Sequence, residues 1–225
     1  MKTTLNRRPC AAFTLIEVLT VVAIVAMLAT MTFAGLRFAQ NKSRQKETIS
    51  NITNINRCIE EYRAERGNYP RPDIDVKDKE ITVKGETWIA GPAMALYQVL
   101  SGDGTDTLRG GEKESTGEQG SSEDEKDPSL GKIYMDNVKA PNKEQIADNV
   151  KMPLVEVDGD SFYLIDSWRH PFRFQVQEVD KNGMSTNLDE MHSASKFEIW
   201  SYGTLKKPDD TEAGKKEWIK SWDAN

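Results

Sequence analysis

Residues 13–36 read FTLIEVLTVVAIVAMLATMTFAGL, an apolar run of 24 residues with a single charged side chain, Glu17. A run of about 18 or more apolar residues is long enough for a membrane-spanning helix. At about 1.5 Å of rise per residue, this run reaches roughly 36 Å, enough for a bilayer core with some tilt. A carboxylate in such a segment is costly unless it has a partner. The sequence therefore predicts a transmembrane segment in which Glu17 has a function.

The segment before this run, residues 1–12, is basic and contains no acidic residue. Positive flanks stay in the cytoplasm, so we expect the rest of the chain to lie on the opposite side of a single-pass anchor. A secretory signal peptide has a shorter apolar core that is followed by a small-residue cleavage site. Here the small residues Ala11 and Ala12 come before the core, which argues against that alternative.

The basic leader, the small residue and the sequence FTLIEVL at residues 13–19 together resemble the prepilin N-terminus of type IV pilins and type II secretion pseudopilins. The resemblance implies that a prepilin peptidase cuts between Ala12 and Phe13, methylates the new amino group of Phe13, and leaves Glu17 to direct filament assembly. The chain departs from the family at Ala12, where Gly is usual. Ala is small enough for the same peptidase site, so we expect processing.

Glu17 and the amine that cleavage creates are expected to be partners. The α-amino group freed on Phe13 is charged near neutral pH. In a filament, Glu17 of one subunit would pair with the Phe13 amine of its neighbour, which removes much of the cost of placing either charge in lipid. The alternative is that Glu17 only reaches toward the membrane interface near the start of the helix.

Residues 37–66 are expected to continue the helix as an amphipathic half. Apolar side chains recur there at steps of three and four, which places them on one helical face: Ile49, Ile52, Ile55, Cys58, Ile59 and Tyr62. The sequence Gly-Asn-Tyr-Pro at residues 67–70 ends the helix, because Gly suits a C-cap and Pro cannot continue it.

The remainder, residues 67–225, is predicted to be a pilin-like globular domain of the α+β class. Its pattern indicates a short helix at residues 92–101 and a hairpin at residues 154–165 with Asp-Gly at the turn. Strands are expected at residues 172–179 and 196–202. We expect a small antiparallel sheet of three or four strands, packed against the amphipathic half of the long helix.

Residues 102–131 differ in composition from the rest of this domain. Within them, residues 112–127 contain seven acidic residues and two lysines and no apolar residue. Such a segment cannot bury enough apolar surface to offset the entropy lost on ordering. The composition therefore predicts a mobile acidic surface loop.

Two later segments also resemble major pseudopilins: DSWRHPF at residues 166–172 and FEIWSYG at residues 197–203. The resemblance implies a calcium site in the loop after the second segment. Two lysines stand near that position and repel a divalent cation, which leaves Asp209 and Asp210 as candidate oxygen ligands. No other cofactor is expected.

The composition argues against several other functions. The net charge of −6 and the lack of a basic stripe argue against nucleic-acid binding. Loss of the leader removes Cys10, so Cys58 is left alone and an intrachain disulfide is excluded. No catalytic or phosphate-binding motif is present, which argues against an enzyme, and His170 is expected to be structural.

These features predict a type II secretion pseudopilin in the bacterial inner membrane, with its N-terminus in the cytoplasm and its globular domain in the periplasm. Its expected partners are prepilin peptidase, other pseudopilin subunits and the inner-membrane assembly platform. One alternative is a type IV pilin of a surface fibre. Such pilins usually carry a C-terminal disulfide, which is absent here. The other is a membrane-anchored periplasmic binding protein or enzyme.

Overall fold

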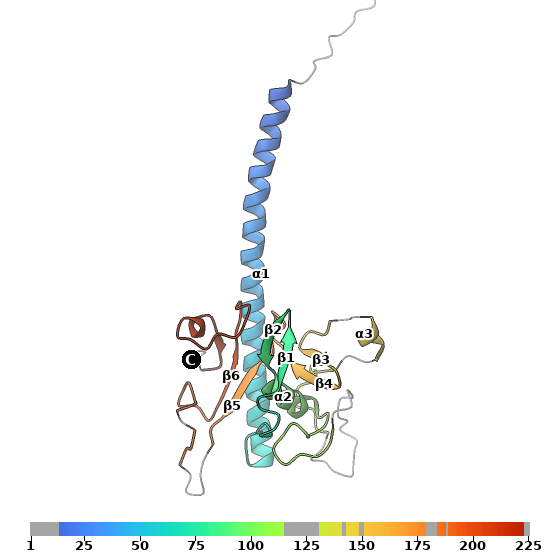
Figure 1. The fold of residues 1–225 in the computed structure, drawn as a ribbon, viewed down its shortest axis with the longest axis vertical. Helices are drawn as coiled ribbons and strands as arrows, with labels where there is room; N and C mark the ends of the chain where they lie inside the picture. Colours follow the sequence, from blue (N-terminus) through green and yellow to red (C-terminus); the bar gives the residue numbers. More distant parts are fainter. Residues whose placement is uncertain are drawn as a thin grey trace, which may run out of the picture. The chain divides into compact units, whose positions relative to one another are not determined.

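The computed structural model describes residues 14–114, 131–140, 143–148, 151–178, 184–187 and 189–222 (Figure 1). The chain divides into two compact units, Met1–Lys42 and Ser43–Asn225. Helix α1 (Leu15–Arg66) has its first part in one unit and its second part in the other.

The first unit contains the apolar part of α1. Its large apolar side chains are exposed all around the helix, from Leu15, which is 82% exposed, to Phe38, which is 67% exposed. A helix that is apolar on every side is typical of a membrane span or of a buried core. Within the described residues, α1 is the one helix long and apolar enough to cross a membrane, judged by length and composition. The expectation of a long N-terminal helix with an apolar first half is therefore confirmed.

The second part of α1 carries the buried face that the spacing predicts. The apolar residues buried on it are Ile52, Ile55, Cys58 and Ile59. Ile49, which we expected on the same face, is 42% exposed, and Thr48 is buried in its place. Thr48 lies four residues before Ile52 and so continues the stripe, whereas Ile49 is rotated from Thr48 by about 100°. The helix ends as predicted at Gly67, whose N–H donates to the carbonyl of Arg63 at 2.8 Å.

Helix α2 (Gly91–Ser101) lies at the centre of the second unit. Every residue of α2 is buried, and the helix packs against strands β4 (Ser161–Leu164) and β5 (Arg173–Val176). It ends at Gly102, which has a φ of +73° and donates its N–H to the carbonyl of Gln98 at 3.0 Å. A short helix at this place was predicted, and its complete burial explains its almost wholly apolar sequence.

The strands form three small antiparallel sheets, so the prediction of one sheet was wrong. Strand β1 (Glu80–Val83) pairs with β2 (Glu86–Ile89), and β3 (Val155–Asp158) pairs with β4. The third sheet has the order β5-β6-β7, with β6 (Phe197–Ser201) at its centre and β7 (Ile219–Lys220) at its edge.

Strands β4 and β5 lie next to each other in the chain but do not merge into one sheet. They are joined by an isolated bridge between Ile165 and Pro171, beside which the N–H of Phe172 donates to the carbonyl of Leu164 at 3.1 Å.

A tight turn joins the two strands of each hairpin. Lys84 and Gly85, between β1 and β2, have φ values of +54° and +86°. Positive φ at both central residues fits the right-handed twist of the flanking strands. This hairpin was not predicted. The hairpin of β3 and β4 is confirmed, with Gly159 and Asp160 between its paired ends.

Residues 102–114 correct the predicted boundary of the acidic loop. The buried Tyr97 hydroxyl donates to Asp103, also buried, at 2.7 Å. The backbone N–H of Thr107 donates to the side chain of Gln98 at 3.0 Å. These residues are therefore packed against α2, although they are polar. Residues 115–130 of the predicted loop lie outside the described residues.

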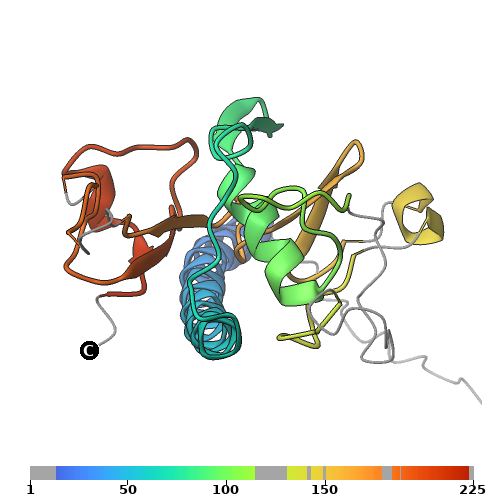
Figure 2. The ribbon, with the colours of Figure 1, turned by 90° about the horizontal axis from the view of Figure 1, so that it is seen from below.

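The second unit has elements on two sides of its part of α1 (Figures 1 and 2). The C-terminal segment with β6 (red) lies on one side, and α2 (light green) with β3 and β4 lies on the other. Two short helices, α3 (Lys143–Ala147) and η1 (Gly214–Lys216), complete the described elements. The fold is α+β, as predicted, with a long N-terminal helix and small antiparallel sheets.

Candidate functional site

The start of α1 is closed by a reciprocal pair of residues, Thr14 and Glu17. Oxygen Oε2 of Glu17 accepts hydrogen bonds from the backbone N–H and from the hydroxyl of Thr14, both at 2.9 Å. The N–H of Glu17 donates in return to Oγ1 of Thr14 at 3.3 Å. This is a capping box, which provides acceptors for N–H groups that have no partner inside the helix. The carboxylate also lies in the first turn, where the helix dipole favours negative charge.

The apolar part of α1 also satisfies its other polar side chains locally. The hydroxyls of Thr20, Thr30 and Thr32 donate to backbone carbonyls three or four residues earlier, at 3.0, 2.8 and 2.9 Å. A hydroxyl bonded in this way leaves no unpaired donor facing lipid. Glu17 is thus the one formal charge between residue 14 and Arg37.

The predicted cleavage and methylation sites, Ala12 and Phe13, lie outside the described residues and stay predictions. The structure places Glu17, the third predicted site residue, on the exposed first turn of α1. Its capping role was not anticipated, although the Thr-x-x-Glu spacing is a recognised sign of a helix start.

Comparison with known protein families gives one match. Residues 7–33 match the model of the prokaryotic N-terminal methylation motif. The chain carries a prepilin-type processing signal. The matched residues include Ala12, Phe13 and Glu17, and they support a pilin-like protein that prepilin peptidase processes. No curated protein and no solved structure matches the chain.

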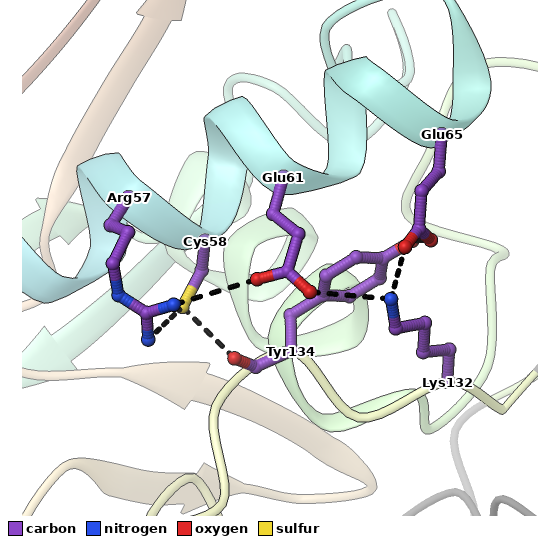
Figure 3. Close-up of polar contacts among 6 residues, drawn as sticks. All are labelled: Arg57, Cys58, Glu61, Glu65, Lys132 and Tyr134. Carbon is purple, nitrogen blue, oxygen red and sulfur yellow. Dashed lines mark hydrogen bonds and ion pairs between the residues drawn. The ribbon is translucent and has the colours of Figure 1, made fainter.

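The second part of α1 is tied to a later segment by the polar contacts in Figure 3. The thiol of Cys58, which is fully buried, donates to the carbonyl of Tyr134 at 2.9 Å. Burial raises the pKa of the Cys58 thiol, which keeps it protonated and unreactive. The hydroxyl of Tyr134 donates to Glu65 at 2.8 Å. Cys58 is therefore a small core residue, as its position on the stripe predicts.

Lys132 completes this set of contacts from the same segment. Its ammonium group pairs with Glu61 at 3.3 Å and forms a close ion pair with Glu65. Hydrogen bonds from Lys132 and Tyr134 hold the pKa of Glu65 below its usual value, and the bond to Glu65 raises the pKa of Lys132. All three charged groups are more than a third exposed, so we expect the ion pairs to position the chain more than to stabilise it.

The segment DSWRHPF forms a turn around a buried carboxylate. Oxygen Oδ1 of Asp166 accepts the backbone N–H groups of Trp168 and His170 at 2.8 and 2.9 Å. Its other oxygen accepts the hydroxyl of Ser201, which ties the turn to β6. Burial raises the pKa of Asp166 to about 6. The His170 ring stacks on Trp88 with 4.2 Å between ring centroids, and burial lowers the pKa of His170 to about 4. These contacts match the structural role that we expected for His170.

The candidate calcium ligands are engaged in local hydrogen bonds. Oδ1 of Asp209 accepts the N–H of Thr211 at 3.0 Å, and Oδ1 of Asp210 accepts the hydroxyl of Tyr202 at 2.9 Å. Across the described parts of the chain, no group of three or more His, Cys, Asp or Glu side chains could hold a metal ion. Calcium binding at Asp209 and Asp210 stays a prediction.

One buried acidic residue, Glu198, was not predicted from the sequence. Glu198 in β6 is fully buried, and it accepts the N–H and faces Nδ1 of His192, each at 3.0 Å. The strand at residues 196–202 was predicted, but the burial of its acidic residue was not. Both faces of β6 are buried, and the sequence of one strand does not show that its second face is covered by other parts of the fold.

Proposed function

We propose that this chain is a structural subunit of a type II secretion pseudopilus. Prepilin peptidase would cut it between Ala12 and Phe13 and methylate Phe13. The assembly platform of the inner membrane would then add it to a periplasmic filament, whose growth drives protein export. The match of residues 7–33 to the methylation motif supports the first step. The exposed apolar half of α1 supports storage in a membrane before assembly.

Glu17 is the residue on which this proposal depends. It is the single charge in an apolar helix, and one of its oxygens carries both hydrogen bonds from Thr14. A carboxylate has about four acceptor positions, so the capped side chain keeps capacity for the amine of a neighbouring subunit. Pairing two opposite charges offsets the cost of burying each of them in a filament core. The capping box holds the acceptor in place for that contact.

Two features favour secretion over a surface fibre. The mature chain would retain only Cys58, which is buried and bonded within the core, so it has no C-terminal disulfide. Residues 166–172 and 197–203 resemble major pseudopilins, and Ser201 joins these two segments through Asp166. Deletion of the gene should abolish export of the secreted proteins and leave surface fibres intact. Loss of fibres with normal export would instead identify a pilin.

The exchange Glu17→Gln tests the assembly role apart from the helix cap. Gln can still accept hydrogen bonds from Thr14 at this position of a capping box, but it has lost the charge. Removing one partner of a buried charge pair costs about 2–5 kcal/mol, so we expect filament yield after detergent extraction and cross-linking to fall by at least about tenfold. Membrane insertion should be unchanged.

Glu47→Gln provides the matched control for this experiment. Glu47 is an exposed acid on the same helix, outside the apolar part. This variant should assemble as well as the unmodified chain. If Glu17→Gln and Glu47→Gln gave equal, normal filament yields, the pairing role of Glu17 would be refuted.

A further inference from the structure

The second unit contains a cavity that the proposed function does not use. Its volume is about 380 Å³, within the range of small-ligand sites. It is lined by residues from the segment 71–78, from strand β5, and by Thr186, Asn187 and Glu190. Its wall combines apolar and charged side chains, among them Pro72, Phe174, Val176, Arg71 and Arg173.

Buried hydrogen-bond donors collect at this cavity. The donors without an acceptor among the described residues are Nε of Arg71, Nε and Nη1 of Arg173, and Nε1 of Trp200. All three side chains line the cavity, and each of these atoms can only donate. An unpaired buried donor is unfavourable, and more so when the group is charged. These four atoms are themselves enclosed, so a ligand oxygen would meet the outer nitrogens of the Arg71 and Arg173 guanidinium groups, which have no acceptor among the described residues.

The sheet holds Arg173 in place for such a ligand. Arg173 and Trp200 are cross-strand partners in β5 and β6. The Arg173 guanidinium lies 5.6 Å from the centre of the Trp200 ring, a distance that permits a cation–π contact. Arg109, another cation of the wall, is already paired with Glu178 at 2.8 Å. Arg71 and Arg173 are thus the guanidinium groups whose donors remain to be satisfied.

The charge of the wall indicates the kind of anion. Four basic side chains line the cavity, namely Arg71, Lys77, Arg109 and Arg173. Three acidic side chains, Asp78, Glu178 and Glu190, line it as well, which leaves a net charge of one. A group with one negative charge balances this wall, whereas a phosphate dianion would meet repulsion from the acids. A guanidinium fork also matches the two oxygens of a carboxylate.

We propose that this cavity binds one carboxylate group through Arg71 and Arg173, with the Trp200 indole beside it. The carboxylate comes from a free organic acid or from an acidic side chain of another protein. The apolar part of the wall, which includes Pro72 and Phe174, accommodates the short aliphatic chain that carries the group.

Nuclear magnetic resonance of the full-length chain in detergent tests this site directly. The Nε–H signals of the arginines and the indole N–H signal of Trp200 would be followed at pH 7 with four additions: succinate, a short Glu-rich peptide, inorganic phosphate, and sodium chloride at matched ionic strength. We expect saturable shifts of the Arg173 and Trp200 signals with succinate, the peptide or both. A response to the peptide alone would assign the site to a protein partner, and a response to succinate would assign it to a free acid.

Four variants complete the experiment. Arg173→Gln and Arg71→Gln should each weaken binding by about tenfold, as expected when a hydrogen bond to a charged group is lost. Arg173→Lys keeps the charge and loses the fork, so it should also bind more weakly and serves if Arg173→Gln fails to fold. Arg44→Gln, at an exposed arginine on α1 away from the cavity, should bind normally. Phosphate binding as tight as carboxylate, or shifts that sodium chloride reproduces, would overturn the proposal.

Discussion

At the scale of single residues, Asp166 and His170 are buried groups whose pKa values move in opposite directions. Burial raises the pKa of Asp166 from 3.8 to about 6. As pH rises through this interval the free energy of unfolding falls, because the folded state keeps a proton that the unfolded state loses. Burial lowers the pKa of His170 from 6.5 to about 4. Between those values the free energy of unfolding rises with pH, because only the unfolded state binds the proton. The two contributions therefore oppose each other.

Replacing His170 with Gln should reveal this balance. The variant loses the contribution that rises with pH and keeps that of Asp166. Relative to the unmodified chain, its free energy of unfolding should therefore fall by about 2 kcal/mol between pH 4 and pH 6. Urea unfolding of both chains at pH 4, 5 and 6 measures the difference. A constant difference across this range would mean that His170 is protonated as readily in the folded as in the unfolded state.

Some individual residues could be predicted from the sequence and others could not. Glu17 and Cys58 were identified because a lone charge in an apolar run and a small residue on an apolar stripe are local patterns. Glu198 and Asp103 were missed because their burial depends on segments that are distant in sequence or on polar partners that no periodicity shows. The donors of Arg71 and Arg173 meet only in the folded chain, so no sequence pattern predicts their cavity.

At the scale of elements, the C-terminal segment is the best example of distant packing. Trp218, just before β7, is 5% exposed and stacks on Trp200 of β6 with 5.5 Å between ring centroids. Its indole N–H donates to the carbonyl of Asp209 at 3.1 Å. No strand was predicted in this segment, because β7 is only two residues long.

Trp218→Ala should therefore destabilise the second unit strongly. Truncating a buried Trp costs about 3–5 kcal/mol, from lost burial and from the space left behind. Chemical denaturation, monitored by near-ultraviolet circular dichroism, measures the decrease in the free energy of unfolding. Trp222→Ala is the matched control, because Trp222 is only half-buried and its loss should cost less. Equal effects of the two exchanges would show that the stack of Trp218 on Trp200 adds little.

Element boundaries were harder to predict than element types. The long helix, α2 and the β3–β4 hairpin followed from periodicity and turn chemistry. The β1–β2 hairpin was missed because Lys84 occupies a left-handed turn position that Asn or Asp usually takes. The break between β4 and β5, which are joined by the isolated bridge between Ile165 and Pro171, was not predicted.

At the scale of the whole molecule, the two units differ in the kind of surface that they expose. The first unit presents apolar side chains around a helix, with one charge and a capped start. The second unit buries its apolar residues in a core built on α2 and the later half of α1. An apolar, capped helix suits storage in a membrane and packing among like subunits. A folded polar unit suits the aqueous side, and this division supports a filament subunit.

Mass spectrometry of the protein purified from bacterial membranes detects both cleavage and methylation. The mature chain should begin at Phe13 and carry one methyl group on its amino nitrogen. The full precursor should accumulate when prepilin peptidase is absent. A membrane-bound chain that still begins at Met1 while the peptidase is active would refute processing by this enzyme.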